Sequence, residues 1–236
     1  MGQRAVSRDR YGARHRFEQT VIPMPGHRRR DNSWTALHLT EHPEADCETV
    51  SQFIRDRFAR DHDAHLTHLM PRLFSIAASD GEMIAAFGLR EAAAPLFMEC
   101  YLDEPVEDRI SRLSGRRVRR EAIIEVGNMA ARLGGARAMI TALTAHLHAA
   151  GFEWVTFTGV ATLRAAFRRL GLHPIEIAAA RPERLSETER QSWGRYFESK
   201  PIVMAGYVPH GYQVLIGRAM QHHTPHSGGG EIQAAP

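Results

Sequence analysis

The chain has 236 residues, of which 43% are hydrophobic and 24% are charged, and its formal net charge is +3. These values are ordinary for a globular protein with one large domain and a sizeable core. No run reaches the ~18–20 apolar residues that cross a bilayer, and no apolar segment of a secretory signal follows the arginine-rich start. We therefore expect a cytoplasmic protein without a transmembrane segment.

The cysteine content excludes a disulfide framework. Cys47 and Cys100 are the two cysteines of the chain, and free thiols in a reducing compartment are expected for them. Cys100 lies in the apolar run FMECYL, which favours a buried, unreactive thiol over a catalytic one.

Residues 1–32 form the most basic part of the chain, with eight arginines against Asp9, Glu18 and Asp31. Apolar periodicity is absent, so we predict a mostly disordered arm. Such an arm could bind nucleic acid, an anionic membrane surface or an acidic partner. The alternative is a solvated extension without a partner. Binding of nucleic acid is disfavoured because aromatic residues do not alternate with the basic ones.

Residues 33–217 are predicted to form one domain, which opens with a strand over 34–39 and a helix that begins at Pro43 and Glu44. The inner stripe of this helix is predicted to comprise Val50, Phe53, Ile54, Arg57 and Phe58. His62, His65 and His68 follow at a spacing that drifts around a helix, so we expect a polar loop near a substrate entrance and no metal site.

Asp80-Gly81 is a strong hairpin signal between strands predicted over 72–78 and 82–90. Arg90 ends the second strand. At this position an arginine could bind an acyl donor or an acidic acceptor; the alternative is an exposed surface arginine. The run 96–102 is apolar apart from Glu99, and 105–113 is predicted to be a short helix. Glu99 faces an acceptor site or pairs with an arginine.

The stretch 118–172 is predicted to be strand, glycine loop, helix, strand, helix. A unit of this kind makes a right-handed crossover between parallel strands. The loop 132–137 places Gly134 and Gly135 at the N-terminus of the long helix, where a phosphate is favoured; the alternative is a tight turn. Arg132 and Arg137 add charge-assisted hydrogen bonds to such an anion.

After this unit we predict a strand over 174–178, a partly helical segment over 179–195 anchored by Leu185 and Trp193, and a closing hairpin. The hairpin pairs 202–208 with 212–216 through Pro209-His210-Gly211. Residues 218–236 are rich in glycine and proline and are predicted to be a disordered tail.

The run EVGNMAARLGGARAMITALTAHLHAAGFEWVTFTGVATLRAAFRRLGLHP, with the flanking pieces PLFMECYLDEPVED and WGRYFESKPIVMAG, is similar to the bacterial thermostable hemolysin family over roughly residues 51–216. That family resembles acyltransferases with an N-acetyltransferase-like fold, close to the acyl-homoserine-lactone synthases. Those synthases have Gly-x-x-Arg at a strand end and Glu-x-x-Arg-x-Ala in the central strand. This chain has Gly88 with Arg90, one residue short, and Glu125 with Asn128 in place of the motif's arginine.

The resemblance implies an α/β (α+β) fold with an N-acetyltransferase-like mixed central sheet flanked by helices. It implies an acyl group moved from a thioester of coenzyme A or phosphopantetheine to an amine of a small molecule, without a metal. Glu125 is the expected base, and a strand break at Gly127-Asn128 would free backbone donors for the oxyanion. The catalytic set is thus Glu125, Asn128 and Arg90.

The donor is expected to contact the central strand and the glycine loop, at Val126, Gly127, Met129, Arg132, Gly134, Gly135, Ala136 and Arg137. Glu99, Thr156 and Thr158 are the expected substrate-binding residues. Tyr101 or Tyr196 is a candidate for protonating the leaving thiolate.

Two alternatives stay open. An acyl-carrier protein is the other candidate donor, and the cluster Arg116, Arg117, Arg119 and Arg120 would then receive its acidic surface. The name hemolysin implies a membrane-active protein without enzymatic activity, although no amphipathic insertion segment is visible. A homodimer is also considered.

Overall fold

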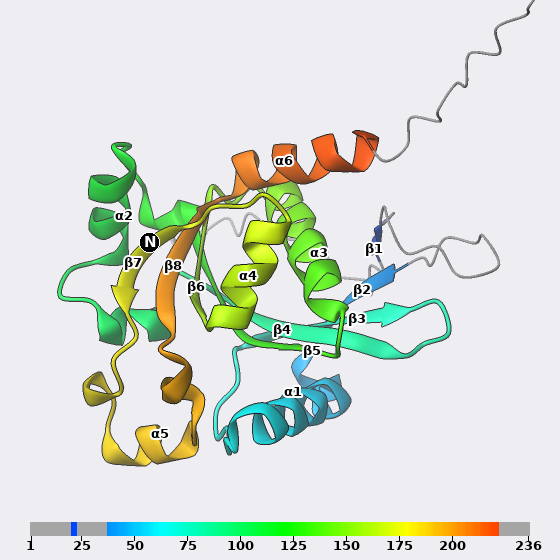
Figure 1. Ribbon diagram of the computed structural model, residues 1–236, viewed down its shortest axis with the longest axis horizontal. Helices are drawn as coiled ribbons and strands as arrows, with labels where there is room; N and C mark the ends of the chain where they lie inside the picture. Colours follow the sequence, from blue (N-terminus) through cyan, green and yellow to red (C-terminus); the bar gives the residue numbers. More distant parts are fainter. Residues whose placement is uncertain (1–19, 23–36, 222–236) are drawn as a thin grey trace, which may run out of the picture.

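The computed structural model describes residues 20–22 and 37–221. Its centre is an eight-stranded mixed sheet with the order β1-β2-β3-β4-β5-β6-β8-β7 (Figure 1). All neighbours are antiparallel except β5 and β6, which are parallel. The strands are β1 Thr20–Ile22, β2 Leu37–His42, β3 Arg72–Ala78, β4 Met83–Glu91, β5 Ile123–Ala131, β6 Trp154–Gly159, β7 Ile175–Ala179 and β8 Ile202–Tyr207. The predicted mixed sheet flanked by helices is confirmed.

Helices cover both faces of the sheet. The α-helices are α1 Glu48–His62, α2 Val106–Ser114, α3 Gly135–Ala149, α4 Ala161–Arg169, α5 Glu187–Ser192 and α6 Val208–Gln221. Helices α3, α4 and α6 pack on one face, and α1 and α2 pack on the other. A short 3-10 helix, Phe97–Tyr101, lies between β4 and α2.

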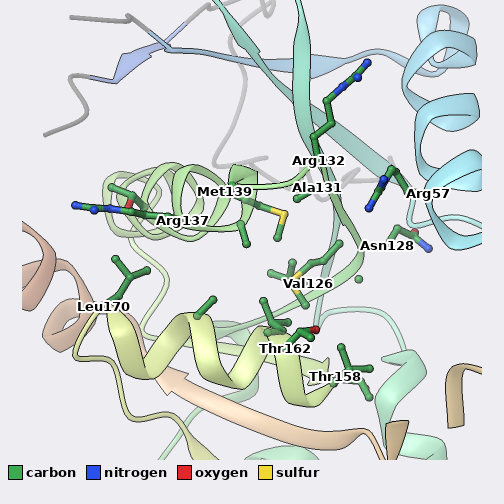
Figure 2. Close-up of a pocket in the computed structure, with 18 of the residues that line it drawn as sticks. Arg57, Val126, Asn128, Ala131, Arg132, Arg137, Met139, Thr158, Thr162 and Leu170 are labelled. Carbon is green, nitrogen blue, oxygen red and sulfur yellow. The ribbon is translucent and has the colours of Figure 1, made fainter. Parts of the chain in front are cut away.

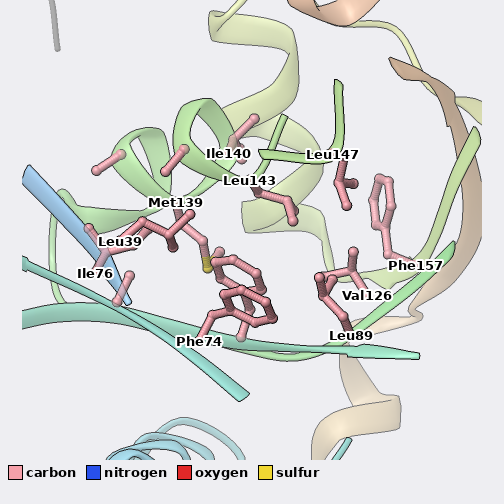
Figure 3. Packing of buried hydrophobic residues seen from close by; sticks show 14 of the residues in the cluster. Leu39, Phe74, Ile76, Leu89, Val126, Met139, Ile140, Leu143, Leu147 and Phe157 are labelled. Carbon is pink, nitrogen blue, oxygen red and sulfur yellow. The ribbon is translucent and has the colours of Figure 1, made fainter. Parts of the chain in front are cut away.

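The predicted strand–helix–strand–helix unit of residues 118–172 is confirmed as β5, α3, β6 and α4. Figure 3 shows the apolar stripe of α3 packed on the strands. Ile140 and Leu147 are each 1% exposed, because residues three and four apart share one face of a helix. They pack in one cluster with Val126 of β5 and Phe157 of β6.

The hairpin predicted around Asp80-Gly81 is confirmed by β3 and β4. The Gly81 N–H donates to the Ala78 carbonyl oxygen at 2.9 Å. Gly81 has a φ of 85°, a conformation that glycine adopts without steric cost. The two-residue signal therefore marks the turn between β3 and β4.

The predicted closing hairpin is wrong in its second half. Residues 212–216 belong to helix α6, which begins at Val208 and runs through Gln221, beyond the expected end of the domain at 217. Pro209 is the second residue of this helix, a position where its missing N–H breaks no intrahelical hydrogen bond. Tyr212 and Leu215 then recur at helical spacing, and Leu215 is buried in one core cluster with residues of α3.

The N-terminal prediction is tested only over a few residues. Thr20–Ile22 pair with Leu37–Leu39 as an edge strand, although they fall in a segment without apolar periodicity. The rest of the predicted arm, residues 34–36 of the first predicted strand, and the predicted tail from 222 onward lie outside the described residues.

Ile140→Ala should lower the free energy of unfolding by about 2–5 kcal/mol, because it leaves a cavity in the close-packed core around α3. Leu113→Ala is the control, since Leu113 is 42% exposed, and its change should stay within about 0.5 kcal/mol. Urea unfolding followed by circular dichroism measures both. Equal effects of the two variants would contradict the assigned core.

Candidate functional site

The parallel strands β5 and β6 separate halfway along the sheet. Their register runs from Ile123 opposite Trp154 to Val126 opposite Phe157, and it stops there. Strand β5 continues to Ala131 without a partner in β6. The edge of β5 beyond Val126 therefore opens onto a gap in the sheet.

A β-bulge accompanies this separation on the other side of β5. Gly88 lies opposite Gly127, but Ala86 lies opposite Ala130, so β5 advances by 130 − 127 = 3 residues while β4 advances by 88 − 86 = 2. Asn128 has a φ of 51°, a left-handed conformation that asparagine tolerates better than most residues. Its Oδ1 accepts a hydrogen bond from the Met70 N–H at 2.6 Å. The predicted break at Gly127-Asn128 is present in this form.

A cleft of about 1200 Å³ passes through the gap. Helices α3 and α4 form its long walls, and α1 and α6 close its ends. Figure 2 shows Met139 of α3 and Thr162 of α4 directed into the space between the two helices, with Val126 at its floor. The cleft thus joins the central strand to the outer ends of α3 and α4.

The N-terminus of α3 borders this cleft. Gly134 precedes the helix with a φ of 84°, no side chain caps the helix, and its first turn holds no acid. A Cβ on Gly135 would lie 2.6 Å from the Ile84 carbonyl oxygen, so this glycine lets the helix start against β4. Ala136 and Arg137 line the cleft beside it. The orphan N–H groups and positive dipole end of α3 are therefore placed to attract an anion.

Positive side chains dominate the cleft. Two acids line it, Asp61 and Glu125, against five arginines: Arg57, Arg132, Arg137, Arg169 and Arg218. Arg57 pairs with Asp61 at 2.8 Å, and Arg132 lies 3.3 Å from Glu82. This excess of arginines over acids in the wall favours a ligand that carries several negative charges.

Glu125 is a buried carboxylate at the inner end of the cleft, and it is 3% exposed. Its two oxygens accept hydrogen bonds from the Phe97 N–H at 2.8 Å and the Met98 N–H at 2.9 Å. Burial raises the pKa of this carboxyl above its ordinary value, while these donors and the charge of Arg90 act in the opposite direction. Glu125 thus positions the 3-10 helix 97–101 and lines the cleft.

The other predicted site residues lie in different places in the structure. Val126, Gly127, Met129 and Gly134 line the cleft with Thr158, whereas Thr156 is fully buried. Arg90 borders a second, smaller cavity on the face opposite α3.

Glu99 is held in an ion pair. Its carboxylate accepts hydrogen bonds from Arg120 at 2.7 and 2.8 Å, and this arginine also bonds Glu107. Arg120 lowers the pKa of Glu99. Of the two interpretations open from the sequence, pairing with an arginine is the one that this geometry supports.

The two candidate tyrosines lie in different places. Tyr196 lines the cleft, and its hydroxyl donates to the Thr158 carbonyl oxygen at 3.4 Å. Burial raises its pKa, which favours the protonated form. Tyr101 is buried in the cluster beside α2. Cys100 is half-buried, and burial raises its pKa to about 11, as expected for an unreactive thiol.

The arginines that precede β5 lie at the other end of that strand from the glycine loop. Arg119 lies 3.8 Å from Glu153, and Arg116 stacks over Tyr207 at 4.9 Å. Nine residues of β5 separate this cluster from the start of the loop, a span of about 30 Å. The cluster therefore lies far from the glycine loop, beside the end of β5 that precedes Glu125.

Sequence reasoning missed many residues of the cleft wall, among them Met70, Arg57, Arg169 and Arg218. None of these four stands in a motif, since each is brought in by a loop or by the surface of a helix. Within the described residues, no group of three His, Cys, Asp or Glu side chains is arranged to hold a metal. No helix among the described residues is long and apolar enough to cross a membrane.

Solved structures with a similar fold include two proteins that align over most of their own length. TofI, in a ternary complex with an inhibitor and MTA, aligns with a TM-score of 0.53 at 14% identity, covering 75% of this chain and 96% of TofI. The AHL synthase LasI aligns with a TM-score of 0.52 at 11% identity, covering 78% of this chain and 96% of LasI. At these identities the likeness concerns the fold.

Sequence comparison gives the family. No curated protein matches the chain. The family model described as thermostable hemolysin matches residues 40–212, which is most of the chain and includes both walls of the cleft. The protein therefore belongs to the thermostable hemolysin family.

Proposed function

We propose that the protein is an acyltransferase that moves an acyl group from a coenzyme A thioester to the amine of a small molecule. The observation that carries this proposal is the separation of β5 from β6 at the Asn128 bulge, beside the uncapped N-terminus of α3. A linear thioester with a charged tail has the shape and the charge that such a cleft accommodates.

The donor arm is proposed to lie along β5 beyond Val126. The backbone N–H and C=O groups on that edge have no partner in β6, so the amides of a pantetheine arm would bond them as an added strand does. The diphosphate would accept hydrogen bonds from the first N–H groups of α3, assisted by Arg132 and Arg137. Arg169 and Arg218 at the outer end of the cleft suit the phosphate on the ribose.

The reaction is a direct displacement at the thioester carbonyl. The acceptor ammonium first loses a proton, its nitrogen then bonds to the carbonyl carbon, and the oxyanion is held by backbone N–H groups freed at the bulge. Collapse breaks the C–S bond and gives an amide and a thiol, with net release of one proton. Glu125 is proposed to take the first proton, directly or through a water, and Tyr196 to protonate the thiolate. Tyr196 then regains a proton, the second one that the nitrogen loses as the amide forms.

The direct test is thiol release from acetyl-, butyryl- and longer acyl-coenzyme A in the presence of a panel of amines. The proposal expects amine-dependent thiol release and an amide product that mass spectrometry detects. A donor at a hundred times its dissociation constant should add about 2.7 kcal/mol of stability. Stabilisation only by an acylated carrier protein would reassign the donor, and absence of both effects would refute the proposal.

Ala136→Asp should separate helix stability from donor binding. An acid in the first turn of α3 favours the helix dipole by about 0.3–1 kcal/mol, but it would repel the diphosphate. We expect coenzyme A to bind at least tenfold more weakly to a protein that is as stable as the wild type, measured by titration calorimetry and urea unfolding. Thr49→Asp is the matched control, because it adds the same charge to the first turn of α1 outside the cleft.

Glu125→Gln should lower acyl transfer by about 10²–10⁴-fold at neutral pH if Glu125 is the base. A base acts when ionised, so the ratio of wild-type to variant kcat/KM should rise with pH through the raised pKa of Glu125, above 4.5. Ionisation of the acceptor cancels in this ratio. The new amide in Glu125→Gln has one acceptor oxygen, whereas Glu125 accepts hydrogen bonds from two backbone N–H groups. Circular dichroism and coenzyme A affinity therefore serve as controls for the fold of this variant. A ratio independent of pH would remove Glu125 as the base.

A further inference from the structure

We infer that the amine acceptor carries a carboxylate, as an α-amino acid does, and that Arg90 binds this carboxylate in a small cavity beside the main cleft. This inference rests on the proposed acyltransferase function. It concerns the face of the sheet opposite α3, where Arg90 borders the second cavity.

The small cavity has a volume of about 90 Å³. A water molecule in the liquid takes about 30 Å³, so the cavity has room for about three waters or for the head group of a small amino acid. Arg90 at the end of β4, Phe97 and the loop that contains His68 form its walls. Its size suits a compact polar acceptor better than an extended chain.

The cavity adjoins the proposed reaction site. Met70, Asn128 and Trp193 line both this cavity and the main cleft. Gly88 and Gly127 lie opposite each other in the sheet, and a Cβ on either would come within 2.3 Å of the Met70 side chain. The thioether of Met70 therefore lies over a notch in the sheet, between the two spaces. An unbranched methionine rearranges at low cost, so an acceptor in the small cavity would reach the thioester at the bulge.

Arg90 is available to a ligand. Its guanidinium donates to the Pro95 carbonyl oxygen at 3.3 Å, and it forms no ion pair within residues 37–221. Glu125 lies opposite Arg90 in the sheet, but its oxygens already accept from the two backbone N–H groups of the 3-10 helix. By contrast, Arg120 is engaged by Glu99 and Glu107.

A guanidinium in this setting matches a carboxylate. It has five N–H donors in a fixed plane, and two of them can bind both oxygens of one carboxylate. Glu189 also borders the cavity, and one of its carboxylate oxygens accepts hydrogen bonds from Ser186 at the start of α5. The walls therefore carry one strong cation and one acid. This pairing favours a ligand with both an ammonium and a single carboxylate over a dicarboxylate.

The test compares amino acids with their carboxamides as acceptors, which keeps the size and removes the charge. All common amino acids are assayed by thiol release with the best acyl-coenzyme A donor. We expect kcat/KM to favour the preferred amino acid over its carboxamide by about 10- to 100-fold, the effect of a charged hydrogen bond. Arg90→Gln should abolish that preference, and Arg90→Lys should retain part of it. Arg112→Gln, at an exposed site on α2, should leave the preference unchanged.

The outcomes separate the two proposals. Amine-dependent thiol release without a preference for the carboxylate, or a preference that survives in Arg90→Gln, overturns this inference and leaves the acyltransferase function intact. Absence of both donor binding and thiol release overturns the function and the inference together. If Arg90→Gln does not fold, the wild-type preference and Arg90→Lys still decide the question.

Discussion

The separation of β6 from β5 after Val126 is the constraint on which the rest of the site depends. A β-sheet satisfies its backbone groups through neighbouring strands, so an unpaired inner edge is costly unless something else bonds to it. Here the bulge at Asn128 turns β5 just after its pairing with β6 ends, and the Asn128 side chain accepts a hydrogen bond from the Met70 N–H. The same gap admits a ligand between α3 and α4. A structural irregularity and a binding cleft therefore have one origin.

Glu125 connects this irregularity to the opposite face of the sheet. It stands one residue before the end of the parallel pairing, and its buried carboxylate accepts two backbone hydrogen bonds from the 3-10 helix 97–101. The geometry therefore gives the residue a clear role in positioning that helix. Burial, which raises its pKa, is also what would suit it to proton transfer. Both roles follow from one placement, and they need a kinetic experiment to be told apart.

Much of the fold was predictable from local pattern. The unit from β5 to α4 has a strong change of period and clear glycine boundaries, and Asp80-Gly81 specifies a hairpin by turn chemistry alone. The end of the chain was not predictable in this way. Pro209-His210-Gly211 looks like a turn, yet the burial of Leu215 in the core and the stacking of Tyr212 on His148 of α3 favour a helix. Local signals are ambiguous where tertiary contacts choose between two states.

The candidate site was predictable along β5 and the glycine loop, because those residues are contiguous. The other cleft residues come from loops and helices far apart in the sequence, so Met70 and Arg218 carried no signal. Two of the expected positions depend on long-range contacts. The carboxylate of Glu99 accepts a hydrogen bond from Arg120, 21 residues later in the chain. Arg90 lines a cavity that is also lined by Trp193, from a distant segment. No spacing rule contains such information.

The structure of the complex with coenzyme A tests the central claim most directly. The account predicts that the pantetheine amides pair with β5 between Gly127 and Ala131, and that the diphosphate lies against the N–H groups of Ala136 and Arg137. The thiol would then end at the Asn128 bulge. A coenzyme bound elsewhere on the protein, or no binding at millimolar concentration, would contradict the account and leave the gap between β5 and β6 without its proposed ligand.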